Sequence, residues 1–184
     1  MERKGDWMQT YTGRQFWPLD PRASEVDIRD IAHSLALQCR FAGHCSTFYS
    51  VAEHSYRVAQ YLVGQGQPAG SCLIGLLHDA SEAYLVDVPR PIKAHLKEYV
   101  AFEDAVMDAI FERFDLRWSV GEYKIVKHAD NVLLATEARD LMATPPVPWE
   151  TMPDPLPGVI RPVGWREAEQ DFLRMFEWLA CGQA

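Results

Sequence analysis

Apolar residues recur every three or four positions along most of this chain, which is the spacing of one face of an α-helix. The pattern predicts helices over 27–40, 51–63, 71–84, 101–114, 120–142 and 165–179. In the first of these, Ile28, Ile31 and Leu35 form the apolar side. No stretch keeps up the strict alternation of apolar and polar residues that a half-buried strand shows. The fold class we predict is therefore all-α, a compact multi-helix bundle.

Short signals indicate where some of these helices begin and end. Ser50 is suited to be an N-cap, and Glu53 three residues later completes a capping box. Ser71 is suited to cap the helix that follows the Gly- and Pro-rich linker 64–70. Pro89 stops the continuation of that helix, because proline lacks the N–H that a helix interior needs.

Prolines also mark two segments that we do not expect to be helical. Pro18 and Pro21 interrupt the start of the chain, which we expect to form an ordered but irregular arm. Seven of the 12 prolines fall between 145 and 162, so we expect an extended crossing loop there. The predicted organisation is a single domain over 1–184, made of an arm at 1–26, a helical core at 27–142, a proline-rich loop at 143–164 and a C-terminal helix at 165–184.

Composition and charge narrow the class of protein. With 184 residues and 48% hydrophobic content the chain can form a core, which argues against disorder. A net charge of −8 argues against binding polymeric nucleic acid, so an anionic ligand would have to meet a metal or a few local cations. The uncharged run 72–77 is far too short to span a membrane. The four cysteines form no CxxC pair, and we expect reduced thiols in a cytoplasmic protein.

Four metal-competent residues lie on the apolar sides of three predicted helices. His54 and Asp130 have apolar neighbours one turn away, and His78 and Asp79 directly follow the most apolar run of the chain. Inward-facing carboxylates are costly unless they are paired or bound to a metal. Two imidazoles and two carboxylates suit one divalent ion, which could be Zn, Mn, Co, Fe or Mg. Taken singly, a histidine such as His54 is more often a hydrogen-bonded core histidine, and Asp130 could cap the helix or pair with Lys127 or His128.

The chain resembles the HD-domain metal-dependent phosphohydrolases. The resemblance depends on the segments 50–55 (SVAEHS), 76–82 (LLHDASE) and 128–130 (HAD). Within that superfamily, 78–93 is similar to the signature of the 5′-deoxynucleotidase branch. The segments 11–14 (YTGR) and 30–33 (DIAH) are similar to small phage- and prophage-type members, some of which resemble phage dATP triphosphohydrolases. The similarity is clearest over roughly residues 27–142 and is weaker in the proline-rich loop and the last helix.

The resemblance implies roles for individual residues. A single divalent ion would be held by His54, His78, Asp79 and Asp130. Glu82 would position or deprotonate the attacking water. Asp87 matches a position that binds the sugar or assists the leaving group.

Three further residues are candidates for binding the substrate. Arg40 matches the arginine on the phosphate side, and Phe41 follows it where related proteins often have tryptophan. Lys93 is a candidate second cation for the phosphate. Phe16 and Trp17, like Phe41, are candidates for stacking on a base, although aromatic side chains in an irregular arm more often fill the core.

The function we expect is hydrolysis of 2′-deoxynucleotides. A metal-activated water would attack the α-phosphorus and cleave the P–O5′ ester. A monophosphate would then release the nucleoside, and a dNTP would release nucleoside and triphosphate. A dATP-like substrate is one of the options. The alternatives are a phosphodiesterase for cyclic or signalling nucleotides and a non-catalytic metal-binding scaffold. Some HD-domain proteins bind a second metal ion through two further histidines, and His95 and His128 are the only candidates for them here. A second tightly bound ion is disfavoured, because His128 points away from Asp130 on a helix. Homo-oligomers, as dimers or larger rings, are expected from the resemblance.

Overall fold

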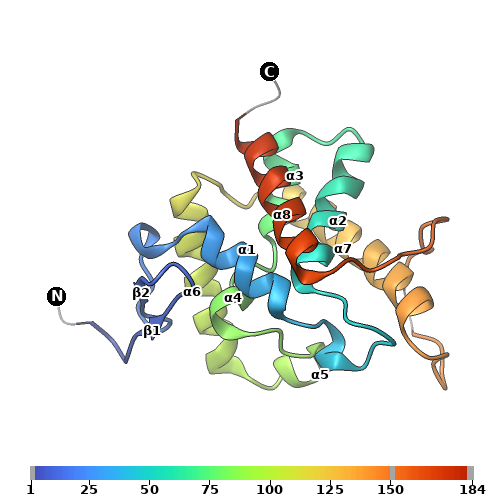
Figure 1. Ribbon diagram of the computed structural model, residues 1–184, viewed down its shortest axis with the longest axis horizontal. Helices are drawn as coiled ribbons and strands as arrows, with labels where there is room; N and C mark the ends of the chain where they lie inside the picture. The colour runs from blue at the N-terminus through green and yellow to red at the C-terminus, as the bar shows by residue number, and fades with distance from the viewer. Residues whose placement is uncertain (1–2, 150–151, 182–184) are drawn as a thin grey trace.

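The computed structural model describes residues 3–149 and 152–181, which form a helical bundle with a small two-stranded sheet (Figure 1). Its longer helices are α1 (Ile28–Leu37), α2 (Val51–Gly64), α3 (Ala69–Leu77), α6 (Lys97–Arg113), α7 (Val120–Leu141) and α8 (Trp165–Ala180). The one-turn helices α4 (Glu82–Leu85) and α5 (Arg90–Lys93) lie between α3 and α6. The all-α prediction is confirmed. Within the described ranges, no helix is both long and apolar enough to cross a lipid bilayer.

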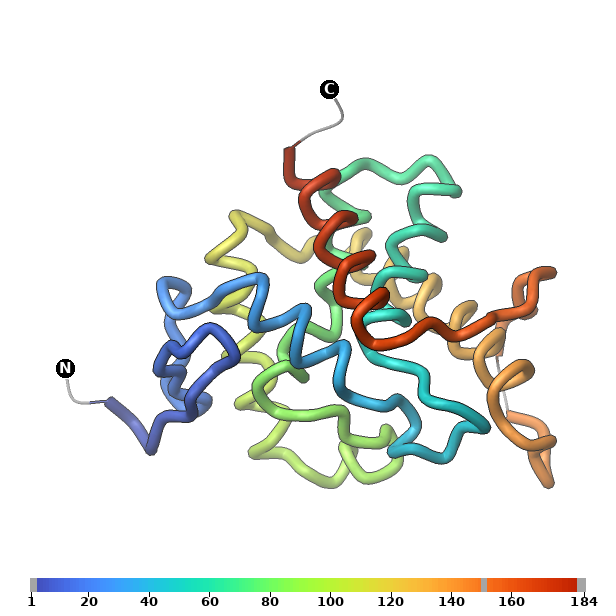
Figure 2. The backbone as a smooth tube through the Cα atoms, in the orientation of Figure 1, coloured from blue at the N-terminus to red at the C-terminus, as the bar shows by residue number. Residues whose placement is uncertain are grey.

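The core lies where the last helix meets the first three. Helix α8 packs against α1, α2 and α3, and α7 packs against α2 and α3 (Figures 1 and 2). The apolar stripes that the sequence pattern predicts supply the buried side chains, among them Ile31, Val58, Leu76, Leu133 and Phe172. This packing brings together α2, the end of α3 and α7, which carry the residues predicted to bind a metal.

Helix α1 is shorter than the predicted segment 27–40. It ends at Leu37, and the chain then becomes extended, because Cys39 forms a β-bridge with Ser50. The backbone N–H of Arg40 donates to the carbonyl of Tyr49 at 2.9 Å. A pairing between segments ten residues apart thus overrides the local helical pattern and fixes the backbone that carries Arg40.

The capping box predicted for α2 is half right. Ser50 is the N-cap, and its hydroxyl accepts from the backbone N–H of Glu53 at 3.1 Å. The Glu53 carboxylate does not turn back to Ser50, and instead accepts from the backbone N–H of Val163 at 3.0 Å. A complete capping box stands at the start of α7, between Ser119 and Glu122.

The single helix predicted over 71–84 is divided in the structure. Helix α3 begins at Ala69, two residues before the expected cap Ser71, because Pro68 serves as the N-cap position. It ends at Leu77, and the backbone N–H of Glu82 then donates to the carbonyl of Asp79 at 3.0 Å. Bonds between residues three apart make a tighter turn, in which side chains at such spacing line up. Asp79 and Glu82 therefore share one side of the turn.

The N-terminal arm contains a short hairpin that the sequence pattern did not predict. Strand β1 (Met8–Gln9) pairs antiparallel with β2 (Gln15–Phe16), and strands of two residues are too short to show alternation. Phe16 is fully buried and stacks on Tyr84, with ring centroids 3.8 Å apart. Phe16 is therefore a core residue, the alternative given for aromatic side chains of the arm, and it is not available for stacking on a base.

The proline-rich segment runs along the molecule without helix or strand over residues 152–164, as predicted. Helix α7 holds it by hydrogen bonds: Arg139 donates to the carbonyls of Leu156 and Gly158, and Asp140 accepts from the backbone N–H of Ile160. Residues 1–2 of the arm, 150–151 of this loop and 182–184 after α8 lie outside the described residues, so those parts of the predicted ranges are not tested.

Candidate metal centre

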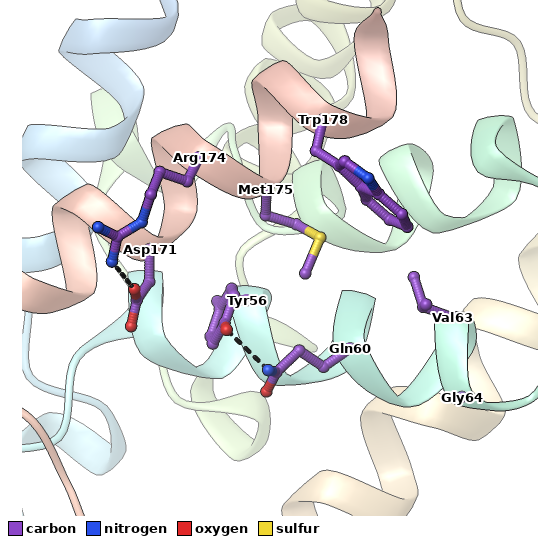
Figure 3. Close-up of a pocket in the computed structure, with 8 residues that line it drawn as sticks. All are labelled: Tyr56, Gln60, Val63, Gly64, Asp171, Arg174, Met175 and Trp178. Carbon is purple, nitrogen blue, oxygen red and sulfur yellow. Dashed lines mark hydrogen bonds and ion pairs between the residues drawn. The ribbon is translucent and has the colours of Figure 1, made fainter. Parts of the chain in front are cut away.

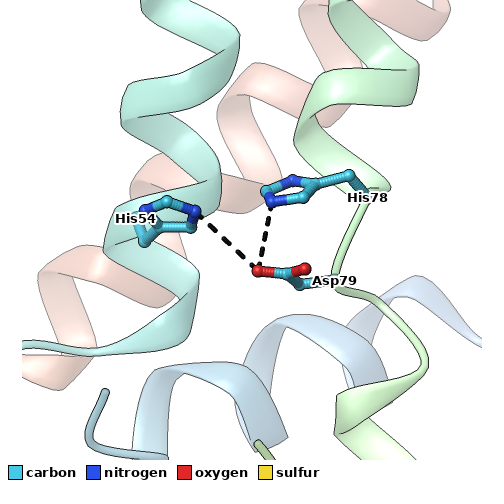
Figure 4. Close-up of side chains that lie close together, drawn as sticks. All are labelled: His54, His78 and Asp79. Atoms are coloured by element: carbon cyan, nitrogen blue, oxygen red, sulfur yellow. Dashed lines mark ion pairs between the residues drawn. The ribbon is translucent and has the colours of Figure 1, made fainter. Parts of the chain in front are cut away.

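His54, His78 and Asp79 place their ligand atoms in one compact group. One such atom from each residue lies within 4.8 Å of the others (Figure 4). His54 comes from α2, whereas His78 and Asp79 come from the turn after α3. The Oδ2 atom of Asp79 is 3.1 Å from Nε2 of His78 and 3.8 Å from Nε2 of His54. Three of the four predicted ligands are therefore brought together.

Hydrogen bonds fix both imidazole rings so that their Nε2 atoms face this group. Nδ1 of His78 donates to the carbonyl of Gly75 at 2.8 Å, and Nδ1 of His54 donates to the carboxylate of Glu137 at 2.6 Å. Both Nε2 atoms are buried and have no hydrogen-bond partner among residues 3–149 and 152–181. Buried polar atoms without partners are rare unless a ligand serves them. Two oriented imidazoles beside a carboxylate are a donor set that fits a divalent transition metal.

Asp130 stands at the edge of this group. Its Oδ1 atom is 3.4 Å from Nε2 of His54, and Lys127 holds its Oδ2 atom at 2.7 Å. Arg90 approaches the same Oδ2 atom at 3.6 Å. The structure thus places Asp130 beside His54, as predicted, but outside the compact three-residue group, with one oxygen engaged by a lysine.

Opposite charges determine the protonation of the ligands. Burial by itself raises the pKa of Asp79, but His78 and His54 lower it well below its usual range. Burial likewise raises the pKa of Asp130, and His54, His78 and Lys127 lower it further than burial raises it. Burial and the charge of Arg40 lower the pKa of His54, yet its carboxylate neighbours raise it to about 9. The centre is therefore anionic on its carboxylates, and a metal ion would displace the imidazolium proton.

Glu82 is nearly buried next to this centre. Its Oε1 atom is 3.8 Å from Nζ of Lys93, while Oε2 has no hydrogen-bond partner within the part of the chain that the structure describes. Burial, with the charges of Asp79 and Asp87, raises the pKa of Glu82 well above its usual value. A carboxylate with a raised pKa and a free oxygen is suited to accept a proton from water near neutral pH.

Asp87 lies in the segment between α4 and α5. Burial raises the pKa of Asp87, while the positive charges of Arg40 and Lys93 oppose that effect. The side chain of Gln38 positions this region: its Nε2 donates to the carbonyl of Glu82 at 3.0 Å, and its Oε1 accepts from the backbone N–H of Asp87 at 3.1 Å. Gln38 was not among the predicted site residues, because it contacts them only through their backbone.

Arg40 is buried beside the centre. Its Nε donates to Glu137 at 3.1 Å, and its Nη1 atom lies 3.7 Å from Oδ2 of Asp79. The guanidinium carbon lies 5.3 Å from the ring centroid of Phe41. Burial by itself lowers the pKa of Arg40, but the negative charges of Glu137, Asp79 and Asp130 have a larger effect and raise it. The structure thus brings a permanent cation to the metal-competent group, and Phe41 packs against that cation.

Lys93 lines a cavity that opens from the centre. Its Nζ atom is 2.5 Å from Oε1 of Glu103, which neutralises much of its charge. The cavity has a volume of 560 Å³ and reaches from His78 and Asp79 to two aromatic side chains, Trp118 and Tyr123. Its other lining residues are Ser81, Glu103, Asp104, Met107 and Asp108. Trp118 and Tyr123 are thus aromatic side chains near the site that the sequence analysis did not select.

Glu137 is the main residue that the prediction missed. It is fully buried on α7, and its carboxylate accepts from His54, Arg40 and Tyr49. A signal was present in the sequence: Glu137 follows Asp130 by seven residues, or about two helical turns, so both share one face of α7. A buried carboxylate on the ligand face needs cationic or N–H partners, and His54 and Arg40 supply them.

Other parts of the surface are separate from this centre. His95 and His128 are exposed, and neither belongs to the metal-competent group. An open groove of 460 Å³ lies between α2 and α8 (Figure 3). Tyr56, Met175 and Trp178 are among the side chains that line it, and none of the predicted site residues does.

The sequence is similar to proteins from two bacteria. The uncharacterized protein YfdR of Escherichia coli K12 is 38% identical over 135 residues, which cover 73% of this chain and 72% of YfdR. The uncharacterized protein RCAP_rcc00048 of Rhodobacter capsulatus is 35% identical over 145 residues, which cover 75% of this chain and 74% of that protein. No model of a protein family matches the chain. Both likenesses extend over more than two thirds of each chain.

Proposed function

The chain belongs to the same family as the uncharacterized protein YfdR of Escherichia coli, and we propose that it is a metal-dependent phosphohydrolase of 2′-deoxynucleotides. In this proposal it is a member of the HD-domain superfamily that cleaves the P–O5′ ester and releases the nucleoside. The observation that carries the proposal is the group of His54, His78 and Asp79, whose two buried Nε2 atoms lack partners among the described residues.

The side chains around that group have the chemistry that phosphate ester hydrolysis needs. A divalent ion bound by His54, His78 and Asp79, with Asp130 as a fourth ligand, would polarise the phosphate and lower the pKa of a water molecule. Glu82 accepts the proton of the attacking water through its unpartnered oxygen. Arg40 donates to the phosphoryl oxygens on which charge develops.

The remaining predicted residues take supporting roles in the proposal. Asp87 binds the sugar or assists departure of the O5′ atom, and Lys93 supplies a second positive charge next to the phosphate. Phe41 keeps the guanidinium of Arg40 in place through their contact. The proposed reaction therefore uses charged side chains from several separate segments of the chain, which the fold brings to one place.

A nucleoside suits the cavity next to the metal-competent group. Its 560 Å³ falls in the usual range of small-molecule sites. Trp118 and Tyr123 offer aromatic faces for a base, and such stacking contributes about 1–3 kcal/mol per base. The net charge of −8 disfavours polymeric nucleic acid, so the proposed substrates are single nucleotides.

The proposal extends to the setting of the enzyme. All four cysteines are free thiols, which agrees with a reducing, cytoplasmic location. We also propose that the chain assembles into homo-oligomers, as dimers or larger rings. Sedimentation velocity measures this oligomeric state directly.

A substrate panel tests the activity. Deoxynucleoside mono- and triphosphates are incubated with Mn, Co, Zn or Mg, and nucleoside, phosphate and triphosphate are measured. We expect metal-dependent release of nucleoside, which Asp79→Ala abolishes. Release of a nucleotide from a cyclic or signalling substrate identifies the phosphodiesterase instead. No turnover with any metal or nucleotide, in a chain that binds metal, identifies the non-catalytic scaffold and contradicts the proposal.

A further inference from the structure

Two carboxylates of helix α7 face the His54 ring, one at each of its nitrogen atoms. Glu137 accepts from Nδ1 at 2.6 Å, and Oδ1 of Asp130 lies 3.4 Å from Nε2. The two carboxylates are seven residues apart and therefore on the same face of α7. His54 belongs to α2, so a ring from one helix lies between two carboxylates of another. This arrangement leaves the ring a single orientation.

The second oxygen of the Glu137 carboxylate engages the cation of the site. Oε2 accepts from Nε of Arg40 at 3.1 Å, while Oε1 serves His54 and also Tyr49, whose hydroxyl is 2.9 Å away. Because the bond to Glu137 uses Nε, the Nη1 atom of Arg40 is free to lie toward Asp79, at 3.7 Å from its Oδ2 atom. One carboxylate thus sets the direction of both an imidazole and a guanidinium.

Stability alone does not account for this network. A fully buried carboxylate and guanidinium lose their hydration, and apolar side chains of similar volume often stabilise a fold at least as well. Glu137 orients the His54 imidazole and the Arg40 guanidinium, and both direct a nitrogen atom toward Oδ2 of Asp79. Carboxylates that hydrogen-bond to the far nitrogen of a metal-binding histidine fix its ring and raise its basicity.

We propose that Glu137 is a positioning residue that fixes His54 for the metal ion and Arg40 for the phosphate oxygens at the same time. The inference rests on the proposed function, since it assigns the ion and the anion to the two groups that Glu137 orients. As a consequence, binding of the metal ion and binding of the phosphate both depend on Glu137. A change confined to Glu137 weakens binding of both the ion and the anion, although it touches neither of them.

Binding measurements on the full chain test this inference without any assay of turnover. Mn²⁺ affinity is measured by competition with a chromophoric chelator, and inorganic phosphate is titrated calorimetrically at saturating Mn²⁺. Glu137→Gln keeps the shape of the side chain but presents an amide to partners that are themselves donors. We expect about 10- to 100-fold weaker Mn²⁺ binding and about tenfold weaker phosphate binding, the size of one charge-assisted hydrogen bond.

A matched variant separates positioning from general disturbance. Tyr49→Phe removes one hydrogen bond from the same buried carboxylate but leaves the bonds to His54 and Arg40 in place, so we expect both affinities to stay within about threefold of the wild type. Glu137→Asp keeps the charge and shortens the side chain. It provides the same two measurements if the amide variant does not fold, and we expect both affinities to fall in it as well.

The outcomes separate this inference from the proposed function. Unchanged Mn²⁺ affinity in the folded Glu137 variants, loss of only one of the two affinities, or equal losses in Tyr49→Phe overturn the positioning role. A wild-type chain that binds no Mn²⁺ overturns both proposals. Paired losses in a chain that hydrolyses no nucleotide support the positioning role and overturn the proposed activity alone.

Discussion

Thr12 donates twice to the carboxylate of Asp30: its backbone N–H lies 2.6 Å from Oδ1 and its hydroxyl 2.9 Å from Oδ2. Next to this pair, Tyr11 stacks on His33 with ring centroids 3.6 Å apart. The hairpin of the arm is thereby fastened to α1. The segments 11–14 and 30–33, which were selected separately in the sequence, are therefore in direct contact.

Removal of the Asp30 carboxylate should release the arm. We expect Asp30→Ala to lower the free energy of unfolding by about 1–3 kcal/mol, because the backbone N–H of Thr12 loses its acceptor while partly buried. Thr12→Ala removes only the hydroxyl bond and should cost about 0.5–1.5 kcal/mol. Urea denaturation measures both. A larger loss in Thr12→Ala than in Asp30→Ala would contradict this account of the contact.

Metal binding should stabilise the folded chain. With free Mn²⁺ at 100 times its dissociation constant, the free energy of unfolding should rise by about 2.7 kcal/mol. His78→Ala removes one of the two buried Nε2 atoms and should abolish most of that increase. His95→Ala is the matched control, since His95 is exposed and outside the metal-competent group. Thermal unfolding with and without Mn²⁺ provides the measurement, and an equal response of the two variants would refute the assignment.

Glu82 should act on turnover and not on metal binding. We expect Glu82→Gln to lower kcat by about 10²- to 10⁴-fold, the usual contribution of a general base. Mn²⁺ affinity should change little, because Glu82 is not one of the ligands. Glu98→Gln makes the same chemical change at an exposed position of α6 and should keep wild-type turnover. If Glu82→Gln retained its kcat while nucleoside was still released, another group would have to accept the proton.

The N-cap of α1 should make stability depend on pH. Asp27 accepts from the side chain and backbone of Arg29, and the side-chain bond lowers the pKa of Asp27 from 3.8 to about 2. Because the folded pKa lies below the unfolded one, the stabilisation is complete above about pH 4 and disappears as the pH falls toward 2. Arg29 is largely exposed, so we expect only about 1 kcal/mol from the charge.

Two substitutions separate the charge of Asp27 from its capping role. Asp27→Asn keeps an acceptor for the helix N–H, so its deficit of about 1 kcal/mol at pH 7 should vanish near pH 2. Asp27→Ala also loses the cap, and about 0.5–2 kcal/mol of its deficit should persist in acid. Urea denaturation at pH 7 and near pH 2 measures both. An Asp27→Asn deficit that does not change with pH would contradict the electrostatic explanation.

The features that depend on local spacing were accessible from the sequence. Apolar periodicity predicted the helices that form the core, and the positions of His54, His78 and Asp79 after or within apolar runs predicted that they face inward. These features follow from the geometry of single elements, so no knowledge of their packing is needed.

The features that depend on distant partners were not accessible in the same way. The end of α1 at Leu37 results from the pairing of Cys39 with Ser50. The carboxylate of Glu53 accepts from the backbone N–H of Val163, 110 residues away, and does not complete the capping box. The hydrogen bond from His54 to Glu137 joins residues 83 apart. Spacing on α7 marks Glu137 as inward-facing, but only the packing of α2 on α7 supplies its partner.

In the tightened turn after α3, the preference of the local sequence for a regular α-helix conflicts with the arrangement of the site side chains. In a regular α-helix, residues three apart differ in direction by about 60°, and residues 71–84 have the composition to continue as one. The bond from the N–H of Glu82 to the carbonyl of Asp79 instead closes a tighter turn that aligns the two carboxylates. Burial, together with the charges of Asp79 and Asp87, raises the pKa of Glu82. Local frustration of this kind persists only where the rest of the fold over-determines it. Substitutions that favour a regular α-helix in 78–81 would therefore strengthen the isolated segment while turning Glu82 by about 60° relative to Asp79 in the folded protein.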